Sequence, residues 1–312
     1  MPRDFLHNHA QFADLIRIVA AEKGIDPGLV EKDYWIMQGL YGLQQLGLTF
    51  ELKGGTSLSK GFQIIHRFSE DIDIRIEPSA GMDVKTNPNQ TKPAHIKSRS
   101  DFYAWLTKTI KIDGIVSVER DTSVDNRDLF SAGIRLAYKN TATPVEGLRE
   151  AVLLEAGFAK VTPNKPKDIS SWAYDYATSK VEIIDNRAKA VACYDPGFTL
   201  VEKLQTISSK YRRQQERGEM PVTRHYYDVY CLLREPSVQT FIGTAAYRQH
   251  KDGHFPKADN KNIAHNPAFQ LKDAETRSLY ERAYEASSAL YYQGKPTFGE
   301  ILATFEMWND RL

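Results

Sequence analysis

The chain has 312 residues, of which 41% are apolar and 26% are charged, with two cysteines and a formal net charge of +1. This composition is typical of a globular protein and excludes a disulfide-rich scaffold and a basic protein that wraps nucleic acid over its whole surface. Because no apolar run reaches the roughly 20 residues of a membrane span and the first residues lack the apolar core of a signal peptide, we expect a cytoplasmic protein with no membrane segment.

Helix and strand patterns alternate in the first part of the chain. Apolar residues at helical spacing predict helices over 9–22 and 27–45. Strands are predicted at "LTFELKGG" and "EDIDIRIEP", followed by a surface loop over 79–93 and a further helix. Three more strand patterns follow, "GIVSVER", "SAGIRLAY" and "EAVLLEAGF", whereas residues 163–196 have no clear pattern.

The remainder of the chain has a helical pattern. Helices are predicted at "TLVEKLQTISSKYRR", "RHYYDVYCLL", "TRSLYERAYEASSALYY" and "GEILATFEMW", with a polar linker or loop over 251–268. We therefore predict an α+β domain over residues 1–195 and a helical C-terminal domain over 196–312.

Two aspartates separated by one residue stand in the predicted strand "EDIDIRIEP". Side chains two apart on a strand point to the same face, so Asp71 and Asp73 project together while Ile72 and Ile74 take the other face. Two neighbouring carboxylates repel each other unless a cation lies between them. Mg²⁺ prefers oxygen ligands, often one or two carboxylates together with phosphate oxygens, so the pattern predicts a metal site.

The segment that precedes these aspartates is typical of a phosphate site. Gly54 and Gly55 allow the backbone to approach a phosphate closely and to present N–H groups to it, and Thr56 and Ser57 add hydroxyl donors at a helix start. Each pattern alone is weak, because Asp-x-Asp often marks an exposed strand edge and Gly-Gly-Thr-Ser often marks a turn. The combination of the two is far more specific.

At these residues, "GGTSLSKGF…RFSEDIDI", the chain resembles the polymerase β-like nucleotidyltransferases, and within them the AbiEii/MenT group of toxins from bacterial toxin–antitoxin and phage-abortive systems. The likeness continues in "AVLLEAGF", "LVEKLQTISSKYRR" and "RHYYDVYCLL". It implies a polymerase β-like domain with a mixed or antiparallel sheet. It also implies site roles for Glu155, Lys203 and Asp228, and a basic position at Arg67 that contacts the triphosphate.

Each of these positions also has a structural interpretation. Glu155 could face water from its strand, and Lys203 could be a solvated helix lysine. Asp228 could pair with Arg224 one helical turn away, and Arg67 could pair with Glu70. The basic run at Lys210, Arg212, Arg213 and Arg217 could be a solvated helix face or could hold RNA phosphates.

The resemblance implies a toxin that is neutralised by a cognate antitoxin. It would transfer nucleotides from a nucleoside triphosphate, with Mg²⁺ or Mn²⁺ as cofactor, to an RNA acceptor such as the 3′ end of tRNA, and so block translation. In this mechanism Asp71 and Asp73 hold the metal, Gly55 and Ser57 contact the phosphates, Lys203 neutralises the departing pyrophosphate, and Asp228 anchors Lys203. Glu155 activates the attacking hydroxyl or completes the metal site. Two alternatives stay open: an AMP-transferring enzyme with a protein or small-molecule acceptor, and a non-catalytic module that binds nucleoside triphosphates.

Overall fold

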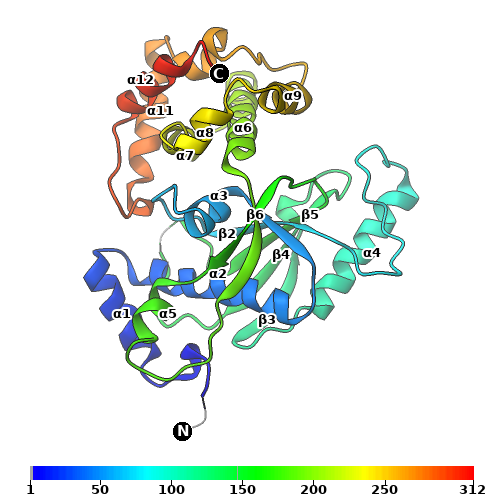
Figure 1. Cartoon of the computed structure of the whole chain (residues 1–312), viewed down its shortest axis with the longest axis vertical. Coiled ribbons are helices and arrows are strands. Elements are labelled where there is room, and N and C mark those ends of the chain that lie inside the picture. The colour runs from blue at the N-terminus through cyan, green and yellow to red at the C-terminus, as the bar shows by residue number, and fades with distance from the viewer. Residues whose placement is uncertain (1–2, 146) are drawn as a thin grey trace. The chain divides into compact units, whose positions relative to one another are not determined.

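The computed structural model describes residues 3–145 and 147–312, which form two compact units (Figure 1). The first, here called the sheet unit, contains Met1–Gly61 and Ser69–Tyr194. The second, here called the helical unit, contains Phe62–Phe68 and Asp195–Leu312. The segment Phe62–Phe68 belongs to the helical unit although it lies inside the predicted N-terminal domain.

The sheet unit contains a seven-stranded mixed sheet with the order β3-β4-β5-β2-β1-β7-β6. Strand β2 at its centre is parallel to β5 and antiparallel to β1, and β1 is parallel to β7. The predicted α+β fold with a mixed sheet is thus confirmed. The strands are β1 (Phe50–Lys53), β2 (Asp71–Ile76), β3 (Ile115–Asp121), β4 (Ser131–Tyr138), β5 (Val152–Gly157), β6 (Asn164–Ile169) and β7 (Ala188–Tyr194).

One face of the sheet is apolar and covered by helix α2 (Pro27–Gln45), which contacts β2, β5 and β7 (Figure 1). A Cβ atom on Gly39 of α2 would lie 3.1 Å from the Cδ1 atom of Ile72, so helix and strand pack closely. Ile72 and Ile74 are fully buried on this side, while Asp71 and Asp73 are only half-buried. The period-two pattern therefore directs the carboxylates to the opposite face.

The described part of the sheet unit contains four further α-helices. Helix α2 begins at Pro27 after Asp26, whose side chain accepts a hydrogen bond from the Gly28 N–H. The other helices are α1 (Phe12–Lys23), α3 (Gly54–Thr56), α4 (Pro93–Thr109) and α5 (Trp172–Ala177).

The helical unit is built around α6 (Pro196–Arg217), which contacts α7, α8, α9 and α10. Its buried residues include Leu200, Leu204 and Ile207, which recur at helical spacing. The remaining helices are α7 (Arg224–Leu232), α8 (Pro236–Phe241), α9 (Ala245–His254), α10 (Pro267–Gln270), α11 (Ala274–Ala286) and α12 (Phe298–Trp308). In the described part of the chain, no helix combines the length and the apolar character needed to cross a membrane.

The structure departs from the sequence-based predictions over residues 163–196 and 251–268, among other places. Residues 163–196, which lack a clear pattern, form β6, α5 and β7; β6 is a polar edge strand, where Pro166 is tolerated because an edge strand leaves N–H positions unpaired. The predicted loop over 251–268 is wrong at both ends, because α9 continues to His254 and α10 begins at Pro267. Helix α9 buries Tyr247 but is otherwise largely polar. Its sequence therefore lacks the apolar periodicity from which a helix would be predicted.

Candidate active site

Three carboxylates share the face of the sheet opposite helix α2. Asp71 and Asp73 alternate with buried isoleucines on β2. Glu155 is the half-buried residue in the otherwise buried strand β5, and it is the register partner of Asp73. Residues in register on adjacent strands project from the same face, so Asp71, Asp73 and Glu155 form one group, here called the carboxylate face.

The turn at Gly54 and Gly55, here called the glycine turn, follows β1 and packs against the carboxylate face. Gly54 has a φ of +72°, a conformation that favours glycine. A Cβ atom at this position would lie 2.2 Å from the Oδ2 atom of Asp73. The buried Thr56 hydroxyl donates a hydrogen bond to the main-chain oxygen of Asp71, which joins the turn to β2. Thr56 thus has a structural role that fixes the turn beside the carboxylates.

The turn continues into a short helical segment. Gly54–Thr56 is α-helical and Ser57–Gly61 is a π-helical turn. The Ser57 hydroxyl is fully buried beside the Cys193 thiol and, among the described residues, has no hydrogen-bond partner of good geometry. A buried hydroxyl is normally hydrogen-bonded, and the Cys193 thiol is the neighbouring group with which this hydroxyl interacts.

Helix α2 anchors this segment with a buried ion pair. Asp33 is 1% exposed, forms an ion pair with Lys60 and accepts a hydrogen bond of 2.8 Å from the Trp172 N–H. Lys60 also donates to the main-chain oxygen of Ser170. Burial raises the pKa of Asp33, and Lys60 only partly offsets this effect. The pair therefore holds the π-helical turn, and with it the glycine turn, against α2.

The two residues before Asp33 are also buried charges. Glu31 accepts hydrogen bonds from the N–H groups of Thr141 and Ala142. Lys32 lies 2.9 Å from Glu70 and donates to the main-chain oxygen of Arg149; burial lowers the pKa of Lys32, an effect that Glu70 only partly offsets. Three consecutive side chains of α2 thus fix three different loops.

Arg149 is a residue that the sequence analysis missed. Lys32 and Glu70 bind its main chain, and its guanidinium lies 3.7 Å from the Oδ1 atom of Asp71. It therefore supplies positive charge to the carboxylate face. Its position in the loop between β4 and β5 gives no pattern that a sequence search would detect.

The other predicted residues form a second group, within the helical unit. Asp228 on α7 is fully buried and accepts two hydrogen bonds from the Arg67 guanidinium, at 2.6 and 2.8 Å. Lys203 on α6 lies 2.9 Å from the Oδ2 atom of the same carboxylate, an oxygen that the Arg67 guanidinium also binds. We call Arg67, Lys203, His225 and Asp228 the Asp228 cluster.

The sequence suggested two ion pairs, Asp228 with Arg224 and Arg67 with Glu70. In the structure the two carboxylates have other partners. Asp228 pairs with Arg67 and Lys203, whereas Arg224 is exposed. Glu70 pairs with Lys32, whereas Arg67 is 5% exposed and is bound by Asp228. An arginine held in this way is poorly placed to contact a triphosphate as well, so Arg67 acts as a buried partner of Asp228.

The electrostatics of the Asp228 cluster follow from its burial. Burial would raise the pKa of Asp228, but the Arg67 and Lys203 cations outweigh it and hold the pKa below the usual value. Burial would lower the pKa of the Arg67 guanidinium, but the Asp228 carboxylate outweighs this effect and raises that pKa. His225 lies 3.5 Å from Lys203, and burial, followed by that cation, lowers the pKa of the imidazole well below its ordinary value. At neutral pH the cluster therefore holds a neutral histidine.

This histidine should make the protein sensitive to mild acid. Because the folded-state pKa of His225 is depressed, its contribution to stability is present above the unfolded value of 6.5 and is lost as the pH falls below it. The wild-type free energy of unfolding should fall by up to about 1.4 kcal/mol per pH unit more than that of His225→Gln. Urea unfolding between about pH 7.5 and 5 measures this difference, with His265→Gln, an exposed histidine of the same unit, as control. Parallel curves for wild type and His225→Gln would contradict the prediction.

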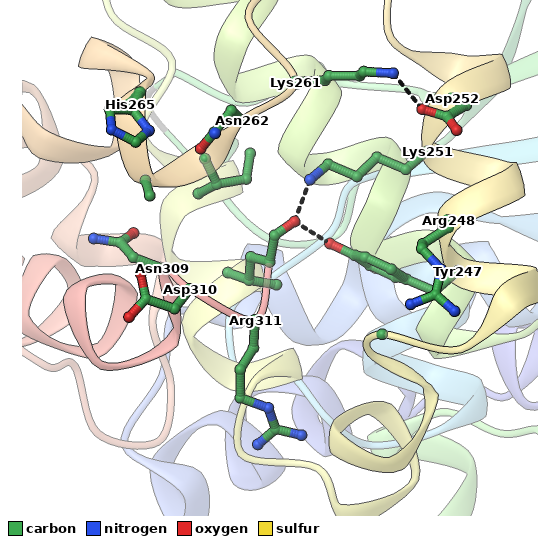
Figure 2. A pocket seen from close by; sticks show the side chains of 14 residues that line it. Tyr247, Arg248, Lys251, Asp252, Lys261, Asn262, His265, Asn309, Asp310 and Arg311 are labelled. Atoms are coloured by element: carbon green, nitrogen blue, oxygen red, sulfur yellow. Dashed lines mark hydrogen bonds and ion pairs between the residues drawn. The ribbon is translucent and has the colours of Figure 1, made fainter.

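The helical unit also contains a polar cavity of about 510 Å³, shown in Figure 2. Tyr247, Arg248 and Lys251 of α9 line it together with Arg311. Tyr247 and Lys251 both donate hydrogen bonds to the main-chain oxygen of Leu312, and burial lowers the pKa of Lys251 to about 8. The predicted site residues, all in the described part of the chain, lie outside its lining.

Comparison with known proteins assigns the family. A search of curated proteins found no match. Among solved structures, the chain is similar to an antigenic nucleotidyltransferase-like protein from Paracoccidioides brasiliensis, at 14% identity and a TM-score of 0.32, covering 86% of this chain and 97% of that chain. The family model described as "Nucleotidyl transferase AbiEii toxin, Type IV TA system" matches residues 35–304, most of the sequence. The chain therefore belongs to the AbiEii nucleotidyltransferase toxin family of type IV toxin–antitoxin systems, and it is a nucleotidyltransferase that uses a nucleoside triphosphate and has an antitoxin partner.

Proposed function

We propose that this toxin transfers nucleotides to an RNA acceptor, the 3′ end of tRNA, in a reaction that depends on a divalent metal ion, Mg²⁺ or Mn²⁺. The observation that carries the metal part of the proposal is the carboxylate face, where Asp71, Asp73 and Glu155 project together beside the Gly54 turn. The acceptor is the one that the family resemblance implies.

The residues present fit a hard divalent cation. Asp71 and Asp73 supply carboxylate oxygens, the ligands that Mg²⁺ prefers, and the register of β2 and β5 places the Glu155 carboxylate beside them. The absence of a side chain at Gly54 lets the Asp73 carboxylate lie directly against the turn, because a Cβ atom would overlap its Oδ2 atom. When bound, the metal would neutralise charge on the phosphates and on the attacking and leaving oxygens.

The remaining site residues bind and orient the nucleotide and the acceptor. Main-chain N–H groups at the start of the Gly54–Thr56 turn, together with the Ser57 hydroxyl, hold the β- and γ-phosphates. Glu155 accepts the proton of the acceptor hydroxyl as its oxygen bonds to the α-phosphorus. The bond to the bridging oxygen breaks, and pyrophosphate leaves. The family resemblance assigns the neutralisation of charge on the pyrophosphate to Lys203, which Asp228 holds.

The transfer assay tests the whole proposal. Purified protein is incubated with Mg²⁺ and each α-labelled nucleoside triphosphate, with total tRNA in one series and protein extract in another. Label in tRNA that disappears with Asp71→Ala is the expected result. Label in protein alone would instead establish an AMP-transferring enzyme. Tight triphosphate binding without transfer would establish a non-catalytic binding module.

The glycine turn gives a second, sharper test. Gly54→Ala and Gly24→Ala place a Cβ atom at similar φ values, +72° and +65°, and each should lower stability by about 1–2 kcal/mol. Only at Gly54 does the new atom collide with Asp73, because nothing lies within 4 Å of the Gly24 position. Gly54→Ala should therefore reduce transfer by about 10²-fold or more through displacement of Asp73, and Gly24→Ala should not. Equal activities of the two variants would remove Gly54 from the site.

A further inference from the structure

A second group of potential metal ligands lies in the helical unit. Glu202 on α6 and His250 and His254 on α9 each offer one ligand atom, and these atoms all lie within 4.8 Å of one another. The group is separate from the Asp228 cluster in its partners: Lys203 binds Asp228 on α7, whereas the neighbouring Glu202 faces His254 on α9. His250 and His254 stand in His-x-x-x-His spacing, so the interpretation that none of the eight histidines has metal-ligand spacing in the sequence is wrong.

The three side chains lie close to the arrangement that a tetrahedral metal site requires. Side chains four apart on a helix lie on the same face, and the rings of His250 and His254 are 4.2 Å apart between centroids. A tetrahedral Zn²⁺ ion with bonds of about 2.0–2.1 Å needs ligand atoms about 3.4 Å apart. The Nε2 atom of His254 lies 3.4 Å from the Oε1 atom of Glu202. One ligand pair therefore has the required spacing, and the third ligand needs only a small side-chain adjustment.

The surroundings of His250 also match those of a metal ligand. Its ring packs edge-on against Phe198 at 4.8 Å and is hydrogen-bonded to the main chain of that residue. Metal-binding histidines usually donate their second ring N–H to a carbonyl or carboxylate, which fixes the ring orientation. Phe198 lies on α6, so one helix would supply both the ligand Glu202 and the group that orients His250.

An ion pair between Glu202 and His254 involves only two of the three side chains, whereas His250 also places a ligand atom within 4.8 Å of both. One carboxylate and two imidazoles form a donor set suited to Zn²⁺ and related transition metals, whereas Mg²⁺ prefers oxygen ligands alone. The group therefore differs in metal preference from the carboxylate face.

We propose that Glu202, His250 and His254 bind one transition-metal ion of the Zn²⁺ class, with a water molecule in the fourth position, and that this ion cross-links α6 to α9. Since Glu202 directly precedes Lys203, the ion fixes the part of α6 that carries the lysine of the Asp228 cluster. The proposal does not depend on the acceptor or on the transfer reaction.

Co²⁺, a spectroscopic substitute for Zn²⁺, provides the test. The full chain is titrated with Co²⁺ in excess Mg²⁺, which occupies the carboxylate face, and visible absorption reports nitrogen-ligated tetrahedral Co²⁺. One equivalent should bind both to wild type and to Asp71→Asn. His254→Ala, at a partly exposed position and so expected to fold, should weaken binding more than about 100-fold, and His265→Ala should not. Zn²⁺ should raise the melting temperature of the wild type and of His265→Ala but not of His254→Ala.

Two results would overturn the proposal. The first is absence of a tetrahedral Co²⁺ spectrum in the folded wild-type protein. The second is unchanged Co²⁺ affinity in both His254→Ala and Glu202→Gln, which would assign the bound ion to other residues.

Discussion

Asp73→Asn and Asp71→Asn are each expected to reduce nucleotidyl transfer by about 10³-fold or more while leaving the sheet unit folded. Each change removes a negative charge from the carboxylate face but keeps the size of the side chain. Loss of metal-mediated charge stabilisation is worth several kcal/mol in the transition state, and each 1.4 kcal/mol corresponds to a factor of ten in rate. Because the two aspartates are half-buried on a strand whose isoleucines form the core contact, the fold does not require their charge.

Glu77→Gln is the matched control for these variants. Glu77 directly follows β2 in phase with Asp71 and Asp73, but it is exposed and pairs with Arg75, so the change removes a carboxylate that is not one of the three site carboxylates. Transfer from α-labelled nucleoside triphosphate should stay near the wild-type rate in Glu77→Gln. Mg²⁺ together with the nucleotide should raise the melting temperature of the wild type but not of Asp73→Asn. Near wild-type transfer by either aspartate variant would show that the carboxylate face is not the catalytic centre.

Asp228→Ala is expected to lower the free energy of unfolding by about 3–5 kcal/mol. The carboxylate is fully buried and is shared by Arg67 and Lys203. Its removal leaves two cations in a dehydrated site with no neutralising group, the most destabilising way to break a buried ion pair. Asp228→Asn, which keeps the shape but not the charge, should also be destabilised, because both cations lose the same countercharge.

Urea unfolding at neutral pH measures the effect. The control is Glu281→Ala, which breaks the exposed pair between Arg277 and Glu281 on α11 of the same unit and should change stability little. A triple variant, Arg67→Met and Lys203→Met with Asp228→Leu, should recover much of the loss, since apolar replacement of a whole buried group of charges is often neutral. If Asp228→Ala had the same free energy of unfolding as the wild type, the three charges would have to be hydrated in solution.

Sequence reasoning was most successful where a local pattern carries the information. The alternation in "DIDIRI" is sufficient to place Asp71 and Asp73 on one face, and the structure has this strand at Asp71–Ile76. The position of Glu155 beside Asp73 could not be predicted from a local pattern. It depends on the register of β2 against β5, two strands far apart in the chain, and only the family resemblance brought Glu155 into the predicted site.

The buried charges were not predictable from local patterns. Helix α2 was predicted from its apolar spacing, but nothing in that spacing indicates that Lys32 and Asp33 are buried. Their partners lie in loops that only the fold brings near. The same holds for Arg67, for which the sequence suggested the neighbouring Glu70, whereas the fold supplies Asp228. Long-range pairing of charges depends on tertiary packing, which one sequence does not reveal.

The three buried charges of α2 have a consequence for how the sheet unit opens. Consecutive helix positions point about 100° apart, so Glu31, Lys32 and Asp33 extend in three directions from a single helical turn. Local unwinding of that turn would release the 141–142 loop, the Arg149 loop and the π-helical turn together. These segments should therefore exchange their amide hydrogens as one cooperative unit rather than as independently fraying loops.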